Sequence, residues 1–359
     1  MTLKKVVYII IGTFLPLSGI AQVSAPVSSN AFLELSADAR GSALAGTMTS
    51  QPDESAAAFY NPSVLGSMQH DYSFSFTHGE YQAGLLHYSF LGFSTKIDST
   101  KGFSAAVVRL GVDDIADTRF LMDGSGIPNY DNIQFFSAAD YAFFLAYGQQ
   151  IEGFHDLKLG AAVKVIHRRV GNFANAWGVG FDIGASFSAG EYDMGVHLSD
   201  ATGSYNNWFY NQDLLGPSFV ATGNDVPYNA LEVNLPVLRL GISRRWPLSQ
   251  YNGGIRAMAD MDIHFDGARN NLLRTSVFSV NPRAAIETDY HELLFIRAGI
   301  GDYQRTTGLN MQQQFNMDFN VGLGVQYEQF RLDYAYLNVA QTAPGLFSHV
   351  LSLNVGLKK

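Results

Sequence analysis

From about residue 70 to the end of the chain, apolar residues alternate with polar or small ones at every second position. The clearest run, 315–327, has Phe, Met, Val, Leu or Tyr at each odd position and Asn, Asp, Gly or Gln at each even one. Similar runs cover 157–165 and 177–187. A β-strand has this period because its successive side chains point to opposite faces, and each run approaches the ~9–11 residues of a tilted strand that crosses a bilayer. The pattern therefore predicts strands with one lipid-facing face and one sheltered face.

These runs amount to about fourteen strands, an even number, as is usual for bacterial outer-membrane barrels. The connections after the even-numbered runs are short and those after the odd-numbered runs are long, with 79–82 as the exception. Short periplasmic turns and long extracellular loops are typical of a transmembrane barrel. We predict an all-β fold, a transmembrane outer-membrane β-barrel of about 14 antiparallel strands with an N-terminal plug segment. The predicted strands are 70–78, 83–94, 101–112, 138–149, 156–168, 175–189, 190–199, 235–245, 252–264, 280–289, 292–302, 313–327, 329–337 and 347–357.

The composition agrees with a barrel and excludes other classes. Charged residues make up only 15% of the 359 residues, aromatic residues 13%, and the mean hydropathy of +0.01 is too polar for a helical membrane protein. The formal net charge of -9 argues against nucleic-acid binding, which needs a basic face. The absence of cysteine from the sequence excludes disulfides, thiolate metal sites and cysteine nucleophiles.

The first 69 residues divide into two predicted parts. Residues 1–21 have the features of a secretory signal peptide, with Lys4 and Lys5 before an apolar core at 6–17. Residues 22–69 are rich in Ala, Ser and Gly and lack the period of two. Because a barrel of this size is too wide for its own side chains to fill, we expect 22–69 to form a plug inside the barrel of 70–359.

Aromatic residues near the predicted strand ends are candidates for the interfacial girdle of a barrel. They are Tyr72, Tyr88, Phe90, Tyr141, Tyr147, Trp246, Tyr327, Tyr334 and Tyr336.

Charged residues of both signs occupy strand positions that the alternation places in the lumen, because charge facing lipid is costly. They form either a conduction or binding path or a paired network that holds the plug to the wall. The candidates for this structural role are Arg256, Asp260, Arg297 and Asp318.

The predicted loop 200–234 is unusually apolar for a segment outside the membrane. Such a loop packs over the barrel mouth or against a partner, and the sequence leaves both open. The candidate partner-binding residues are Trp208, Phe209, Tyr210, Leu214, Leu215 and Phe219. The 9 histidines are scattered and no His-Glu-x-x-His spacing occurs, so we predict a protein that is not an enzyme, with no cofactor and no metal site.

The segment 32–46 begins Phe32-Leu33 and contains Asp38-Ala39-Arg40 before small residues, and Pro52-Asp53 and Asn61-Pro62 follow. This pattern resembles the opening of the mature PorV/PorQ family, and more closely its PorV branch. The resemblance implies a fatty-acid-transporter-like barrel of the Bacteroidota outer membrane that acts in the type IX secretion system. It also implies roles in plug structure for Asp38, Arg40, Asn61 and Pro62. Arg40 would pair with a lumenal carboxylate, and Asn61-Pro62 would form a turn.

Two functions follow as hypotheses. The leading one, implied by the resemblance, is an accessory or shuttle barrel that binds the large translocon barrel, the C-terminal sorting domains of secreted cargo proteins, or both. The alternative is an outer-membrane channel for hydrophobic small molecules. Under both hypotheses we expect the outer wall of the barrel to contact membrane lipid, and we expect no nucleic acid as a partner.

Overall fold

The computed structural model describes residues 29–122, 125–154, 156–221, 223–225, 229–267, 269–307, 313–337 and 347–358. The predicted signal peptide lies outside these residues. Within them, no helix has both the length and the hydropathy needed to cross a bilayer.

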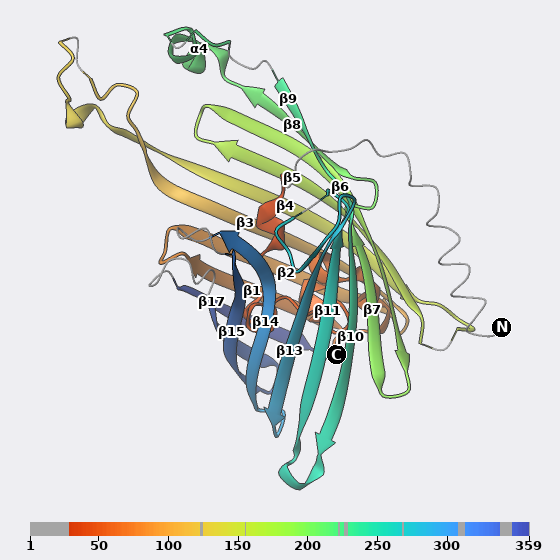
Figure 1. Ribbon diagram of the computed structural model, residues 1–359. Helices are drawn as coiled ribbons and strands as arrows, with labels where there is room; N and C mark the ends of the chain where they lie inside the picture. Colours follow the sequence, from red (N-terminus) through yellow and green to blue (C-terminus); the bar gives the residue numbers. More distant parts are fainter. Residues whose placement is uncertain are drawn as a thin grey trace.

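The chain forms one antiparallel sheet that closes on itself, because β1 pairs with both β2 and β17 (Figure 1). The prediction of about fourteen barrel strands is confirmed, and the closed barrel has 14. The barrel strands are β1 (Tyr72–Tyr81), β2 (Leu86–Asp98), β3 (Lys101–Asp117), β4 (Gln134–Gln150), β5 (Lys158–Val170), β6 (Ala174–Ala189), β7 (Tyr192–Ser199), β10 (Val237–Leu248), β11 (Gly253–His264), β13 (Ser279–Tyr290), β14 (Leu294–Thr307), β15 (Gln313–Tyr327), β16 (Phe330–Leu337) and β17 (Ser348–Leu357).

One end of the barrel carries the short turns, such as 190–191 and 328–329, and we call it the short-turn end; the opposite end is the long-loop end. At the long-loop end, β3 and β4 project beyond their neighbours and carry η4 (Tyr130–Asn132) at their tip (Figure 1). η5 (Ser249–Tyr251) forms a turn at the short-turn end.

The segment predicted as loop 200–234 has structure of its own, which the sequence analysis missed. β7 stops at Ser199, and positive φ angles at Asp200 (52°) and Gly203 (76°) turn the chain out of its path. β8 (Ser204–Tyr210) then pairs with the long-loop half of β6, and β9 (Asn229–Asn234) pairs with β8. Between them lies α4 (Gln212–Ala221), and a further short strand, β12 (Leu273–Arg274), pairs with β13. β8, β9 and β12 were not predicted because none of them forms a long alternating run of its own. β8 pairs with β6, β9 with β8, and β12 with β13.

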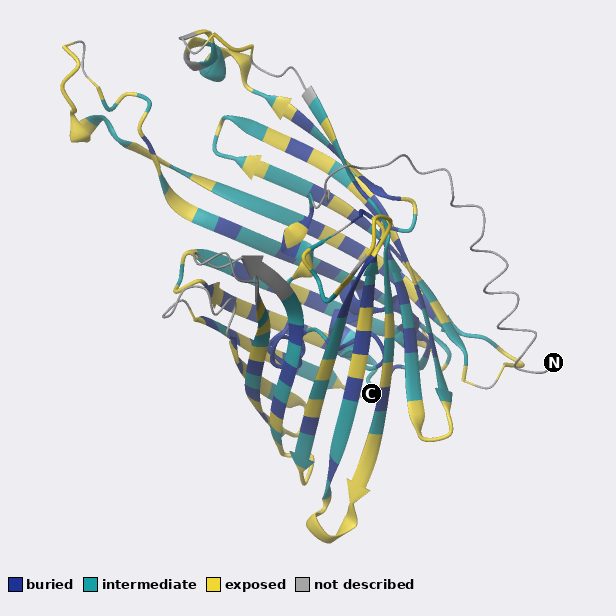
Figure 2. Ribbon diagram, in the orientation of Figure 1, coloured by how far each residue is buried: buried dark blue, intermediate teal, exposed yellow. Residues whose placement is uncertain are grey.

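Burial follows the predicted alternation along the strands (Figure 2). On β1, Phe74 and Phe76 face outward, whereas Ser75 and Thr77 are buried inside. Two members of the predicted girdle depart from the expectation, because Tyr88 and Phe90 on β2 are fully buried and face the lumen. They face inward because this side of the lumen is filled by the apolar part of the plug.

The N-terminal segment folds inside the barrel as a chain of short helices (Figure 1). Phe59 is the centre of its apolar side and packs edge-to-face against Phe90, with ring centroids 6.2 Å apart, and against Phe144 at 5.7 Å. The helices are η1 (Ala31–Glu34), α2 (Ala39–Ala43), η2 (Glu54–Ala56), α3 (Ala57–Tyr60) and η3 (Pro62–Ser67).

Glycines form the wall wherever the plug touches it most closely. Gly102, Gly148, Gly160 and Gly184 pair in sequence across β3, β4, β5 and β6 and make a side-chain-free row. A Cβ added to Gly160 would lie 2.5 Å from both the Pro62 carbonyl oxygen and the Ser63 nitrogen. The row therefore lets plug backbone contact wall backbone directly, which is the close approach that glycine permits within a strand.

Candidate functional site

Arg40 joins the plug to the wall. From α2 its guanidinium donates two hydrogen bonds to Glu287 of β13, at 2.9 and 3.0 Å. It also donates to the Gln51 carbonyl at 3.0 Å and to the Asp53 carboxylate at 3.2 Å. The two-pronged geometry of arginine fits a carboxylate in this way, and the pair is buried.

Two further arginines extend this contact into a network. Arg297 of β14 lies 2.7 Å from Glu287 and 2.7 Å from Asp333 of β16. Arg331 contacts Asp333 at 2.7 Å and also pairs with Asp53 of the plug. Three guanidinium groups and three carboxylates thus alternate in a closed ring between the plug and the wall, so the buried charges neutralise one another. This plug latch consists of Arg40, Asp53, Glu287, Arg297, Arg331 and Asp333.

The plug's own carboxyl groups respond in opposite ways to burial. At Asp53, burial opposes ionisation, but Arg331 and Arg40 outweigh it and hold the pKa of that carboxyl below its ordinary value. Burial and the charge of Asp53 raise the pKa of Asp38 to about 7. Asp38 is the N-cap of α2 and accepts a hydrogen bond of 2.6 Å from the Gly41 nitrogen, so its part in the plug is structural.

Asn61 and Pro62 tie the other side of the plug to the wall. The Asn61 side chain caps η3 by accepting from the Ser63 nitrogen, and its amide donates to the carbonyl of Thr49 at 2.9 Å. It also donates to carbonyls of β6 and β7 at 3.4 Å, while Pro62 begins η3 against the glycine row. The pair therefore forms a turn that also holds plug and barrel in register.

The other predicted lumenal residues lie apart from the latch or at its edge. Arg256 donates to the Gln51 side chain at 3.1 Å. Asp260 accepts from the Thr49 nitrogen at 2.9 Å. Asp318 faces inward on β15, opposite Gly301 and away from the plug contacts of the other two. Asp53 and the wall glycines were not among the predicted site residues, although the Pro52-Asp53 motif was the signal available for Asp53.

A second buried charge cluster lies where β7 ends. Lys164 of β5 is 2.8 Å from Asp182 of β6 and 2.8 Å from Asp200 just beyond β7. All three residues are almost fully buried. The cluster anchors the point at which the chain leaves the wall.

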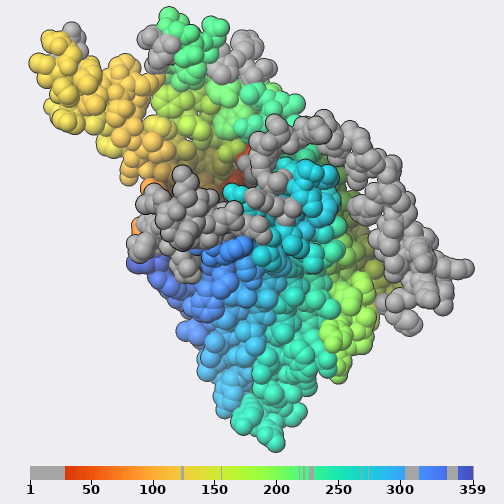
Figure 3. All heavy atoms as spheres, in the orientation of Figure 1, coloured from red at the N-terminus to blue at the C-terminus, as the bar shows by residue number. Residues whose placement is uncertain are grey.

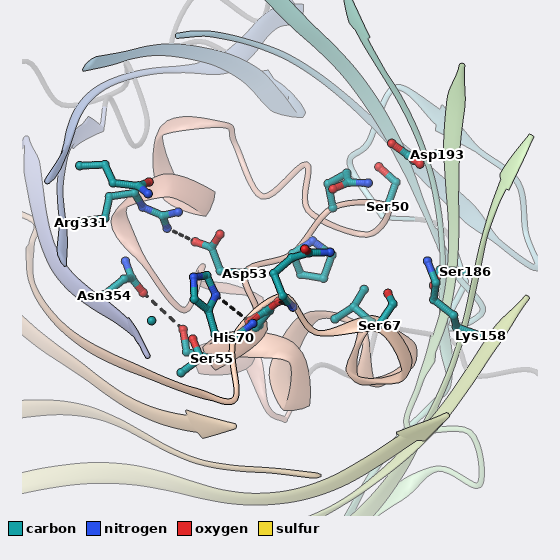
Figure 4. Close-up of a pocket in the computed structure, with 18 of the residues that line it drawn as sticks. Ser50, Asp53, Ser55, Ser67, His70, Lys158, Ser186, Asp193, Arg331 and Asn354 are labelled. Atoms are coloured by element: carbon teal, nitrogen blue, oxygen red, sulfur yellow. Dashed lines mark hydrogen bonds and ion pairs between the residues drawn. The ribbon is translucent and has the colours of Figure 1, made fainter. Parts of the chain in front are cut away.

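A lumenal cavity of about 380 Å³ opens at the short-turn end between plug and wall (Figure 4). The plug contributes Ser50, Asp53 and Ser55, and the wall contributes Lys158 and Arg331 among others. At the long-loop end, the described cavity between η1 and the start of β10 measures only about 50 Å³. That volume suits one or two water molecules, so the two ends of the lumen differ sharply.

The outer wall carries an apolar groove of about 340 Å³ across β6, β7, β10 and β11, which we call the wall recess. Its floor is the backbone of Gly195 and Gly241, which pair across β7 and β10. On the inner side of the same glycines lies the plug, since a Cβ on Gly241 would be 2.8 Å from the Thr49 Cβ. The recess is lined by Phe187, Met194, Gly195, Val196, Leu240, Gly241, Ile242, Ala259, Asp260 and Met261.

The predicted partner-binding residues divide between two environments. Trp208 is buried and turned inward, where Arg168 lies 5.1 Å from its ring centroid. Phe209 points the other way and is exposed, while Tyr210, Leu214, Leu215 and Phe219 are half-buried. Arg119 of the β3–β4 projection donates to the Leu214 carbonyl at 3.0 Å. The segment thus extends the wall beside β6, contacts the β3–β4 projection and presents apolar side chains outward.

No family profile matches the sequence, and no curated protein matches it either. Solved structures do match over nearly their whole length. The Pseudomonas putida toluene transporter TodX is 12% identical, with 90% of this chain and 99% of that chain covered and a TM-score of 0.53. The Ralstonia pickettii toluene transporter TbuX is 12% identical, with 89% and 98% covered and a TM-score of 0.52.

The monoaromatic hydrocarbon channel CymD is 10% identical, with 90% and 98% covered and a TM-score of 0.50. All three of these proteins are transporters or channels for aromatic hydrocarbons. At such low identity, what this chain shares with them is the fold, a closed 14-strand antiparallel barrel.

Proposed function

We propose that this protein is an outer-membrane channel that takes a small hydrophobic molecule from the membrane and releases it at the short-turn, periplasmic end. The observation that carries the proposal is that the wall recess and the lumenal cavity lie on opposite sides of the same strands. Phe187 and Met194, a cross-strand pair of β6 and β7, line both.

The sizes of the cavities favour access through the wall over access along the barrel axis. The cavity between η1 and the start of β10, about 50 Å³, cannot hold a hydrocarbon ring, whereas the recess offers about 340 Å³ of mainly apolar space. Only the glycine backbone of β7 and β10 separates that space from Thr49 and Ser50 of the plug. A path from the recess to the lumenal cavity needs both a local separation of the β7–β10 pairing at Gly195 and Gly241 and a shift of this plug turn.

The fold shared with toluene transporters and a monoaromatic hydrocarbon channel supports the same function. It favours the channel hypothesis over the secretion hypothesis, which rests on the motif resemblance.

Uptake tests the proposal. The chain is expressed in Gram-negative cells that lack their own hydrophobic channels, and accumulation of radiolabelled toluene is followed. Val196→Trp fills the recess from outside, so uptake should fall close to the rate of cells without the protein. Leu323→Trp, on the outward face of β15, is the matched control and should leave uptake unchanged. Equal uptake by both variants, at equal amounts of folded barrel, would contradict the proposal.

A second function, docking of a protein partner, is favoured by one specific observation. Two projections extend from the long-loop end (Figure 3), and apolar side chains are exposed on both. They include Phe120, Met122, Ile127 and Tyr130 on the β3–β4 projection, and Phe209, Val220 and Leu231 on the β8–β9 segment.

On this second proposal the partner is a protein, such as a translocon barrel or a secreted cargo domain, that covers these side chains. Crosslinking in intact cells from residue 120 or 209 should capture a defined outer-membrane or secreted protein, and Phe209→Ser should reduce the yield. Tyr251→Ser at the short-turn end is the control. If neither position 120 nor position 209 crosslinks to a protein, the docking proposal is contradicted and the channel proposal is unaffected.

A further inference from the structure

Three potential metal ligands gather on the outer face of the barrel, at the long-loop end of β1 and β2. His78 and Glu80 are two residues apart on β1 and therefore share the outward face. Glu80 pairs in register with His87 of β2. A ligand atom from each of the three side chains lies within 4.8 Å of the other two, and the rings of the two histidines stack with centroids 6.4 Å apart.

Within the described part of the chain, the side chains of His78, Glu80 and His87 take part in no hydrogen bond or ion pair. The nearest outward neighbours are Ser89, which pairs with His78, and His349 of β17, which pairs with Glu80 and contacts the Tyr334 hydroxyl. Beyond them the outward face is apolar, with Phe76 and Leu91 both more than half exposed. A carboxylate at the edge of an apolar belt is costly without a compensating charge. A bound cation would supply that charge.

The donor set selects the kind of cation. Two imidazole nitrogens and one carboxylate oxygen suit zinc and the neighbouring divalent transition metals, whereas magnesium and calcium prefer oxygen ligands alone. At zinc bond lengths of ~2.0–2.1 Å, donors in a tetrahedral site lie about 3.3 Å apart. His78 and Glu80 can close the remaining gap by rotating their side chains, because both are exposed.

We propose that His78, Glu80 and His87 form a binding site for a divalent transition-metal ion such as zinc on the outside of the barrel rim. Three protein ligands leave a fourth position for water or for an external donor at the membrane surface. The ion ties β1 to β2 at the end where the sheet pairing stops, next to the β1–β17 seam that closes the barrel. This inference is independent of the proposed channel function.

Calorimetric titration of the full chain in detergent, without a histidine tag, tests the site with zinc and with magnesium as the comparison ion. Zinc should bind at one ion per barrel, and magnesium should neither bind with similar affinity nor displace it. His87→Ala and Glu80→Gln should each weaken zinc binding at least tenfold. His291→Ala, in an exposed turn at the short-turn end, should leave it unchanged.

The altered side chains face outward, so each variant should keep the heat-dependent gel migration of a folded barrel. As a readout that needs no variant, cobalt added to the wild-type chain should give the visible absorption of a nitrogen-ligated ion. The proposal is overturned if zinc shows no saturable binding, if the His78→Ala/His87→Ala protein binds as tightly as wild type, or if the cobalt spectrum is that of the free aqueous ion.

Discussion

Replacing Arg40 by methionine should release the plug while leaving the barrel folded. The side chain is buried and contacts two carboxylates, Glu287 and Asp53. Removing one member of a buried ion pair costs about 3–5 kcal/mol, because the other member is left without compensation. Here Glu287 keeps Arg297 and Asp53 keeps Arg331, so we expect the lower end, about 3 kcal/mol.

That free energy corresponds to a change of roughly 150-fold in the equilibrium between docked and released plug, at 1.4 kcal/mol for each factor of ten. The barrel strands do not depend on Arg40, since their pairing is continuous around the sheet. Single-channel recording in planar bilayers measures the effect as the fraction of time in which the barrel conducts ions. Arg40→Met should raise that fraction by about two orders of magnitude.

Arg245→Met provides the control. Arg245 also pairs with a carboxylate, Asp289, but its side chain is 37% exposed, and such pairs are worth only about 0–1 kcal/mol. The reasoning is refuted if Arg40→Met opens no more often than Arg245→Met while both remain folded barrels. The plug would then be held by its apolar side and the glycine row alone.

Three other outcomes are expected. Gly160→Val places carbon atoms against the backbone of Pro62 and Ser63, so it should lower the stability of the docked plug by about 1–3 kcal/mol, seen as faster proteolysis of the N-terminal segment. The pKa of Asp38 rises from 3.8 to about 7 on folding, so the contribution of this carboxyl to stability is complete below about pH 4 and is lost as the pH rises through 7. Asp38→Asn keeps the N-cap oxygen but cannot ionise. The variant should therefore lose less thermal stability than the wild type between pH 5 and pH 8. An equal slope in wild type and variant would contradict that assignment. Asn61→Ala removes the cap of η3 and the hydrogen bond to the Thr49 carbonyl, so it should lower the free energy of unfolding by about 1–2 kcal/mol in the same thermal assay. Unchanged stability would mean that Pro62 alone forms the turn.

Several features of the barrel could be predicted because they are local properties of the chain. The alternation in residues 315–327 predicts a strand and its two faces without reference to any neighbour, and β15 occupies that range. Inward charges such as Arg297 followed from the same rule. Tyr88 and Phe90 show its limit, because the alternation assigns a face to a residue but does not tell what fills the space beyond that face.

The plug latch and the wall recess could not be predicted, because their residues come together only when the barrel closes. Arg40 meets Glu287 across 247 positions of sequence, and the wall recess joins β7 to β10 with the whole segment 200–236 between them. Such contacts are created by strand register and by the seating of the plug, and no pattern within one segment encodes them. The sequence by itself determined that there would be a barrel with charge inside. Only the tertiary structure decided which charges pair, where glycine lets the plug touch the wall, and where the outer wall is recessed, because these depend on strand register and on the seating of the plug.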